Sequence, residues 1–279
     1  TDVSNAKLQS TGGLVETSGN SLLTDGISIR ASQWLLDPAD VTISSATDSG
    51  YTASGSNYTP NSASATSVVN TTTLQNAINA GTSVTISTTN SGTSGSGAGN
   101  ITIANALTFN NTGAQDATLT LNADNGIIQN AAITATGSKL VNVTMTANGN
   151  YQGNTAANAN SKGITLNAGI TTNGAINLTG TNKSSASGGS GAGVYIYGQT
   201  VTTAGAGDIS ITGFANNGIG LYTGGSTTIN GKNITLSGTA TTTTSGTGVN
   251  LNRDSTTNIN ATANLAITGM VNGTGTGSG

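Results

Sequence analysis

Apolar residues in this chain recur in short alternating groups, most regularly between residues 163 and 269. One phrase appears four times: two apolar residues separated by one residue, then Thr or Ser, then Gly. The phrases place their first apolar residue at Ile176, Ile209, Ile234 and Leu265. Because side chains alternate between the two faces of a strand, each phrase predicts a short strand with one buried face.

Two further apolar sets recur in the same order within each interval. One set reads Ile164/Leu166, Val194/Ile196, Ile219/Leu221 and Val249/Leu251, and the other reads Ile170, Val201, Ile229 and Ile259. The interval is roughly 25–33 residues, which is typical of solenoids. The sequence therefore predicts an all-β fold, a parallel β-helix with three short strands per coil, each pairing with its equivalent in the next coil.

The same strand pattern extends over residues 1–279, which predicts a single solenoid unit of roughly ten coils. Residues 44–72 contain few apolar positions and are interpreted as a surface insert. Residues 72–80 place Leu74, Ala77 and Ile78 at helical spacing before Gly81, which predicts one short flanking helix. Stretches rich in Gly, Ser and Thr at 184–193 and 239–248 are interpreted as loop inserts.

Composition excludes several classes of protein. The 279 residues include 41 Gly and no Cys, only 6% are charged, and the net charge is −3. The recurring apolar pairs argue against disorder, and seven scattered basic residues form no patch for nucleic acid. No apolar run approaches the length needed for membrane insertion, so we expect none. Polar sequence at both termini suggests a segment of a longer solenoid.

Candidate catalytic chemistry is sparse. The absence of His and Cys removes His-based triads, Cys nucleophiles and most zinc sites. The Asp37/Asp40 pair brackets a proline and is interpreted as turn-forming, and Asp208 occupies a corner position that sister phrases fill with Ala or Asn. We therefore expect no enzyme activity, no metal and no cofactor. A polysaccharide-cleaving β-helix remains the enzymatic alternative.

The feature with most chemical potential is a tyrosine-rich face. Aligning the first strand of each unit directs one column of side chains outward, namely Asn167, Tyr197, Tyr222 and Asn252. This alignment places Tyr197 next to Tyr222, with Tyr195 and Arg253 nearby. The candidate ligand face therefore comprises Tyr195, Tyr197, Tyr222, Asn167, Asn252 and Arg253. It is either a structural aromatic ladder or a platform for a sugar ring.

Two phrases near the start carry a family resemblance. Gly12-Gly-Leu-Val-Glu16-Thr-Ser-Gly19, followed by Trp34-Leu-Leu-Asp-Pro38 and Asp40-Val-Thr-Ile43, resembles the high-molecular-weight adhesins of two-partner secretion, grouped with the filamentous-haemagglutinin-like exoproteins. The resemblance covers about residues 12–43. It implies a right-handed β-helix at the bacterial cell surface, exported unfolded through an outer-membrane translocator. Trp34 itself is interpreted as a buried packing residue rather than a ligand-binding residue.

These observations lead to one functional expectation and three alternatives. We expect a non-enzymatic, secreted surface adhesin segment that attaches to a host-cell glycan or protein receptor. The main alternative is a structural stalk whose binding region lies elsewhere. An ice- or crystal-binding solenoid would need a continuous Thr-x-Thr array, which the later coils interrupt, and the polysaccharide-cleaving enzyme is the third alternative.

Overall fold

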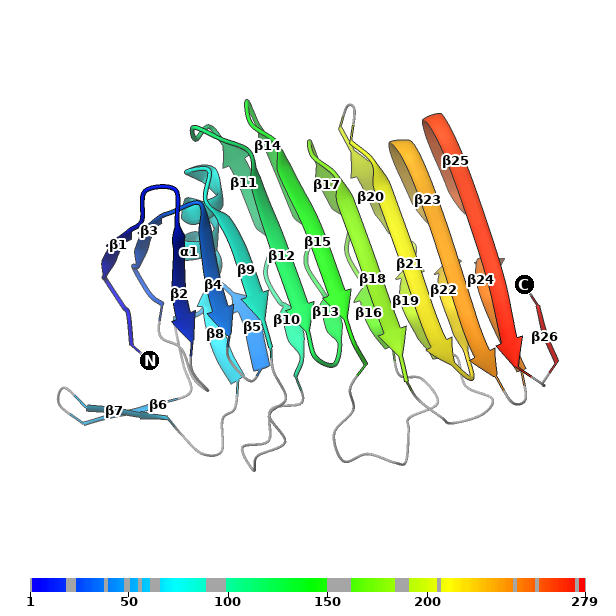
Figure 1. Cartoon of the computed structure of the whole chain (residues 1–279), viewed down its shortest axis with the longest axis horizontal. Coiled ribbons are helices and arrows are strands. Elements are labelled where there is room, and N and C mark those ends of the chain that lie inside the picture. Colours follow the sequence, from blue (N-terminus) through cyan, green and yellow to red (C-terminus); the bar gives the residue numbers. More distant parts are fainter. Residues whose placement is uncertain are drawn as a thin grey trace.

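The strands stack side by side along the long axis of the molecule (Figure 1). This computed structural model describes residues 2–18, 24–37, 40–47, 51–54, 57–60, 66–88, 99–149, 162–183, 191–204, 207–242, 245–253, 256–273 and 276–278. Nearly all strand pairs are parallel, and they arrange in three columns that we call columns 1, 2 and 3. The predicted parallel β-helix is confirmed.

Among the described residues, column 1 is a nine-stranded sheet. In spatial order its strands are β26 (Thr276–Ser278), β24 (Ser245–Arg253), β22 (Ile219–Gly224), β19 (Ala192–Tyr197), β16 (Lys162–Leu166), β13 (Ile127–Gln129), β10 (Ile101–Ile103), β5 (Asp40–Ser44) and β8 (Thr66–Asn70).

Columns 2 and 3 form one thirteen-stranded sheet, because β23 (Thr228–Thr242) and β25 (Asn258–Gly273) run through the corner between them. Column 2 begins with β11 (Leu107–Asn111), β14 (Ile133–Gly137), β17 (Ile170–Thr172) and β20 (Thr200–Thr203). Column 3 contains β2 (Leu14–Ser18), β4 (Gln33–Asp37), β9 (Ser83–Ser87), β12 (Ala117–Ala123), β15 (Val141–Ala147), β18 (Ile176–Asn182) and β21 (Ile209–Asn216).

The predicted registers of columns 2 and 3 are confirmed. In column 3, Ile176 pairs with Ile209, which pairs with Ile234 and then with Leu265. In column 2 the pairs run through Ile170, Val201, Ile229 and Ile259. The inward side chains of successive coils stack on one another, so burial of apolar surface accumulates along the axis.

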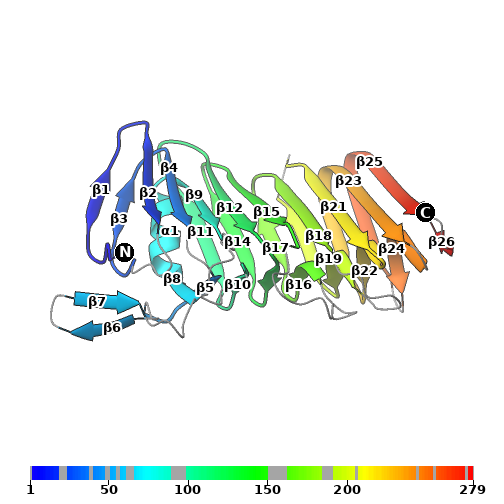
Figure 2. The same ribbon diagram turned by 60° about the horizontal axis from the view of Figure 1, so that its bottom comes forward.

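Two predicted excursions are smaller than expected. Within 44–72, residues 66–70 form β8 of column 1, and the part outside the solenoid includes an antiparallel hairpin of β6 (Tyr51–Ser54) and β7 (Asn57–Pro60) (Figure 2). The predicted loop at 239–248 is mostly strand, because β23 continues to Thr242 and β24 begins at Ser245. Threonine and serine occur at exposed strand positions as well as in loops, so the composition of this stretch wrongly predicted a loop.

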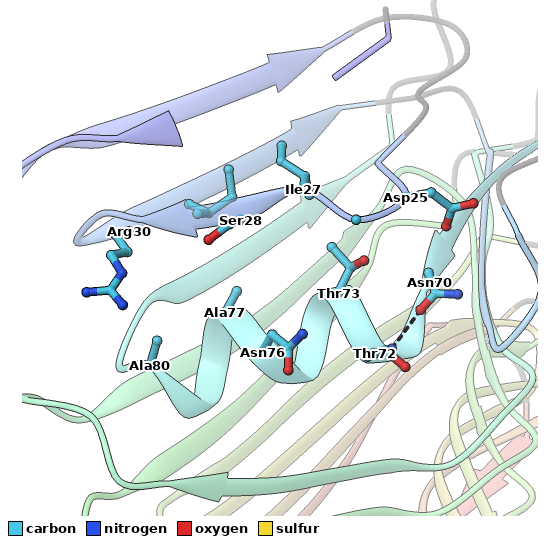
Figure 3. A pocket seen from close by; sticks show the side chains of 12 residues that line it. Asp25, Ile27, Ser28, Arg30, Asn70, Thr72, Thr73, Asn76, Ala77 and Ala80 are labelled. Carbon is cyan, nitrogen blue, oxygen red and sulfur yellow. Dashed lines mark hydrogen bonds between the residues drawn. The ribbon is translucent and has the colours of Figure 1, made fainter. Parts of the chain in front are cut away.

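The helix α1 (Thr71–Asn79) replaces a column 2 strand. The backbone N–H of Thr72 donates to the Asn70 side chain at 2.9 Å, which caps the first turn (Figure 3). Leu74 and Ile78 are fully buried, so the helix packs its apolar face onto the core, against β3 (Ser28–Arg30) on one side and β11 on the other. The predicted short helix is confirmed.

One coil departs from chain order. In column 1, β5 lies between β8 and β10, although both of these strands follow it in the sequence. Its residue Val41 pairs with Ser67 of β8 and with Ile101 of β10. Ladder hydrogen bonds therefore join β5 to later chain on both of its edges.

Trp34 lies in the core of the first coils, as predicted. Its side chain is fully buried, and its Nε1–H donates to Thr17 Oγ1 at 2.9 Å. Val15 on β2 and Val84 on β9 pair with it in register. The indole therefore has its one polar group satisfied while it fills the interior.

Two glycine columns bring columns 1 and 3 into backbone contact. We call this the glycine seam; its members are Gly163, Gly193, Gly220 and Gly248 in column 1 and Gly180, Gly213 and Gly238 in column 3. A methyl group on Gly213 would overlap the carbonyl oxygen of Gly220, and one on Gly238 would overlap that of Gly248. No side chain fits at the glycine seam, so the two sheets touch main chain to main chain.

Gly213→Ala is expected to lower the free energy of unfolding by about 3 kcal/mol, because the added carbon can be placed only by separating the two sheets. Thr212→Ala, at the adjacent outward position, is the matched control and should change it by less than about 0.5 kcal/mol. Urea denaturation followed by circular dichroism measures both. Equal stability of the two variants would contradict backbone contact at the glycine seam.

Candidate functional site

The tyrosine face lies on column 1, but its register differs from the predicted one. Tyr195 of β19, and not Tyr197, pairs with Tyr222 of β22; Tyr197 pairs with Gly224. The predicted alignment of Val194 and Ile196 with Ile219 and Leu221 is wrong by two residues at this level. Leu221 pairs with Val194 instead.

The glycine seam explains this register. Gly220 must lie in line with Gly193 and Gly248, and this fixes Leu221 beside Val194. The next inward position is then Thr223, whose side chain is fully buried. Its Oγ1 lies 3.1 Å from Thr257 Oγ1. The available sequence signal was a glycine directly before the first inward aliphatic residue, as in Gly163-Ile164, Gly193-Val194, Gly220-Leu221 and Gly248-Val249.

Three aromatic rings lie nearly parallel on this face. The ring centroids of Tyr195 and Tyr222 are 4.8 Å apart with 6° between their planes. Tyr197 lies 6.3 Å from Tyr195, with planes at 7°. Lys162 Nζ lies 4.5 Å from the centre of the Tyr195 ring. Because β19 lies between β16 and β22, the ammonium group and Tyr222 approach Tyr195 from opposite sides.

The rings differ sharply in exposure. Tyr222 is only 7% exposed, while Tyr197 is 46% exposed. Gly224 makes room for the Tyr222 ring, since a side-chain carbon there would lie 2.6 Å from the Tyr222 hydroxyl oxygen. Tyr222 therefore forms the buried part of the stack, and Tyr197 offers the accessible aromatic surface.

The three remaining predicted residues are placed differently. Asn167 follows β16 at the level before Tyr197 and is exposed; its Nδ2 donates to Asn130 Oδ1 at 2.8 Å. Asn252 and Arg253 lie at the end of β24, and their side chains are outside the described residues. Lys162 was missed by the sequence interpretation, because it precedes the apolar pattern and no sister unit has a cation there.

Burial raises the pKa of the Tyr195 hydroxyl above its ordinary value of 10.0, and the Coulombic effect of Tyr197 raises it further. The folded protein therefore keeps this proton over a pH range in which the unfolded chain has lost it. Stability that depends on neutral Tyr195 is intact below pH 10.0 and is lost as the pH rises through the raised pKa.

Two of the described acidic side chains accept hydrogen bonds from neighbouring coils. Asp40 Oδ1 accepts from the Asn100 N–H at 2.6 Å, while the side chain of Asp37 is outside the described residues. Asp208 Oδ1 accepts from Asn233 Nδ2 at 2.7 Å, and Asn233 Oδ1 accepts from Asn264 Nδ2 at 2.7 Å. A short ladder of side-chain hydrogen bonds therefore runs from Asp208 through Asn233 to Asn264 in successive coils. In the part of the chain that the structure describes, no three His, Cys, Asp or Glu residues group around a potential metal position.

The outer face of column 3 carries polar side chains in register. One line of hydroxyls is unbroken over five coils, whereas Asn177 and Ala266 interrupt the neighbouring line. The unbroken line consists of Thr146, Thr179, Thr212, Ser237 and Thr268. The prediction that later coils interrupt the Thr-x-Thr array is therefore confirmed for one line of side chains and wrong for the other.

Comparison with known proteins adds no relative: no family model, no curated protein and no solved structure matches this chain. The class of the protein, a parallel β-helix, therefore rests on strand order and register alone. None of the helical segments described here is both long and apolar enough to cross a bilayer.

Tyr222→Ala should destabilise the protein by about 2 kcal/mol, because it removes a buried ring that stacks on Tyr195. Tyr197→Ala should cost less than about 1 kcal/mol, because nearly half of that side chain is already in water. Thermal unfolding of the two variants distinguishes them, and the opposite ranking would contradict the assigned register.

A pH titration followed by the ultraviolet absorbance of phenolate should show a component that ionises above the ordinary range, because burial raises the pKa of Tyr195. Tyr195→Phe should remove that late component, while Tyr197→Phe should leave it in place, because burial is the larger cause of the raised Tyr195 pKa. If the control variant lost the late component and Tyr195→Phe kept it, the assignment of the raised pKa to Tyr195 would be wrong.

Proposed function

We propose that this protein is a non-enzymatic adhesin segment of the bacterial cell surface, which attaches to a glycan or protein receptor on a host cell. The parallel β-helix serves as a stiff scaffold, and the face around Tyr197 makes the contact. No cofactor takes part.

The observation that carries this proposal is the exposure of Tyr197 on a rigid sheet. Its ring is 46% exposed, although strand pairing holds its backbone and Gly224 and Gly225 lie beside it. Asn167 at the preceding level and Lys162 near Tyr195 add polar groups to the same face. An aromatic ring with amide and ammonium neighbours is the combination that sugar rings and polar peptides use for docking.

The location and route of export follow from the resemblance near the start of the chain. A cell-surface adhesin of two-partner secretion passes through an outer-membrane translocator as an unfolded chain. A cysteine-free chain suits such a route, because no disulfide has to form during or after passage.

One observation favours the alternative of a structural stalk. Tyr222 is buried and stacked on Tyr195, so two of the three rings already satisfy each other within the protein. An aromatic ladder of this kind stabilises strand pairing by about 0.5–1 kcal/mol without any ligand. In that case the receptor-binding region lies elsewhere.

The discriminating experiment is a host-cell and glycan-array binding screen of the unaltered protein, Tyr197→Ala and Phe214→Ala. Phe214 is the matched control, since it is 42% exposed on the outer face of column 3. We expect Tyr197→Ala to bind about tenfold more weakly and Phe214→Ala to bind as the unaltered protein does.

Circular dichroism establishes that all three proteins are folded. Binding that survives Tyr197→Ala would remove the tyrosine face from the proposal. No binding by any of the three folded proteins would favour the stalk.

A further inference from the structure

The outer face of column 3 carries five hydroxyl side chains in register, which we call the hydroxyl line. Its members are Thr146, Thr179, Thr212, Ser237 and Thr268. None of these side chains has a hydrogen-bond partner among the described residues. On column 2, by contrast, Asn230 Nδ2 donates to Thr202 Oγ1 at 3.1 Å, and Asn260 Nδ2 donates to Asn230 Oδ1 at 2.7 Å. Column 3 therefore leaves its hydroxyl groups for water or for an outside partner.

Two further lines of outward side chains flank the hydroxyl line. The preceding line, two residues earlier in each strand, consists of Thr144, Asn177, Ser210, Thr235 and Ala266. The following line, two residues later, consists of Thr181, Phe214, Thr239 and Met270. Phe214 is 42% exposed and Met270 is 47% exposed. The bulky apolar side chains thus lie on the following line, and the small Ser210 and Ala266 lie on the preceding line of the same two strands.

The centre of this face is uncharged, and its two margins carry opposite charges. In the described strands from β9 to β25, the hydroxyl line and the preceding line include no acidic or basic residue. Asp208 lies two residues before the preceding line, and Lys183 lies two residues after the following line; both are exposed. A second copy of this face, turned through half a rotation about the long axis, brings each margin over the margin of opposite sign.

The hydroxyl line is complementary to a copy of itself. A hydroxyl group both donates and accepts hydrogen bonds, so two such lines can bond to each other. Strand pairing sets the spacing of successive members at about 4.8 Å. A second copy repeats this spacing without error, whereas a polymer or crystal lattice of another period drifts out of register along the five coils. The best-matched surface is therefore the same face of another molecule.

The flanking lines select the orientation of the second copy. A two-fold axis along the hydroxyl line, midway between the two faces, places the following line of each molecule over the preceding line of the other. Phe214 and Met270 then cover the line that contains Ser210 and Ala266. A two-fold axis across the strands would instead set the two bulky lines against each other. Facing sheets lie about 10 Å apart, which accommodates a bulky side chain over a small one and a bridging water between hydroxyls.

The area of the face is sufficient for a stable pair. Seven coils at about 4.8 Å and strands of about seven residues at about 3.3 Å give a face of about 34 Å by about 23 Å. In Figure 1 these strands lie side by side, from β9 to β25. Two such faces together would bury about 1,600 Å², which is the usual size of a specific protein–protein interface.

We propose that two copies of this protein pair side by side through the outer faces of column 3, with parallel long axes and facing hydroxyl lines. Both molecules then run in the same direction, as two chains that project from one surface would. Column 1 is a separate sheet, so pairing leaves the tyrosine face exposed and does not depend on the adhesive function proposed above. Substitutions on column 3, Phe214→Ala among them, should leave the affinity of the tyrosine face for a soluble receptor unchanged.

Analytical ultracentrifugation of the whole protein over a range of concentrations tests the pairing. The unaltered protein should show a monomer–dimer equilibrium. Thr212→Lys should raise the dissociation constant at least about tenfold, because two ammonium groups would face each other across the two-fold axis. Thr202→Lys, at an equally half-buried position on the outer face of column 2, is the matched control and should dimerise as the unaltered protein does.

Cross-linking through single cysteines tests the orientation. The chain contains no Cys, so each substitution introduces one thiol. A short bismaleimide should join two copies of Thr212→Cys and leave Thr202→Cys uncoupled. In a mixture of Thr146→Cys and isotope-labelled Thr268→Cys, only like variants should be joined, because these two positions lie in different coils of a parallel pair.

An unaltered protein that stays monomeric at its highest soluble concentration, or a dimer that Thr212→Lys leaves intact, would overturn the proposal. Joining of Thr146→Cys to Thr268→Cys would overturn the parallel orientation. Retention of a monomeric protein on ice or on an uncharged polysaccharide, lost in Thr212→Lys, would assign the hydroxyl line to that ligand instead. Circular dichroism checks that the variants are folded, and Ser237→Lys takes the place of Thr212→Lys if that variant is not.

Discussion

The register of the coils between residues 162 and 253 depends on the backbone contact at the glycine seam. A parallel β-helix could pair its strands in several registers, because neighbouring coils differ in length and carry similar Thr-rich strands. At the glycine seam only one register is possible, since any side chain would occupy the volume of a carbonyl group on the facing sheet. Gly180, Gly213 and Gly238 align in column 3 for this reason, and the facing glycines align in column 1.

This constraint also determines the surface chemistry. Once Gly220 is fixed, Tyr222 falls beside Tyr195, and the two rings stack at 4.8 Å. Tyr222 is buried in this stack, so Tyr197 is the accessible ring. An interior packing requirement therefore decides which tyrosine faces solvent, although no atom of the glycine seam belongs to the tyrosine face.

Much of the fold could be predicted from sequence where hydrophobic periodicity was the controlling factor. The registers of columns 2 and 3 followed from isoleucine and leucine alone, as in Ile176, Ile209 and Ile234. Column 1 failed at β22, because Thr223 pairs with Ile196 and takes the inward position that the apolar pattern assigns to Leu221. Reading the glycine before each aliphatic residue as a packing requirement would have corrected the register. Lys162 had no such signal, since no sister unit carries a cation at the corresponding position.

The position of β5 has a consequence for how the molecule resists unravelling. Stacked coils generally fray from an end, since each outer coil is held by a single neighbour. Here β5 is bonded on one edge to β8 and on the other to β10, both of which come later in the chain. Tension applied before Asp40 cannot detach β5 without also breaking a ladder to residues 101–103. The position of β5 therefore fastens the first coils to residues 101–103, which lie later in the chain.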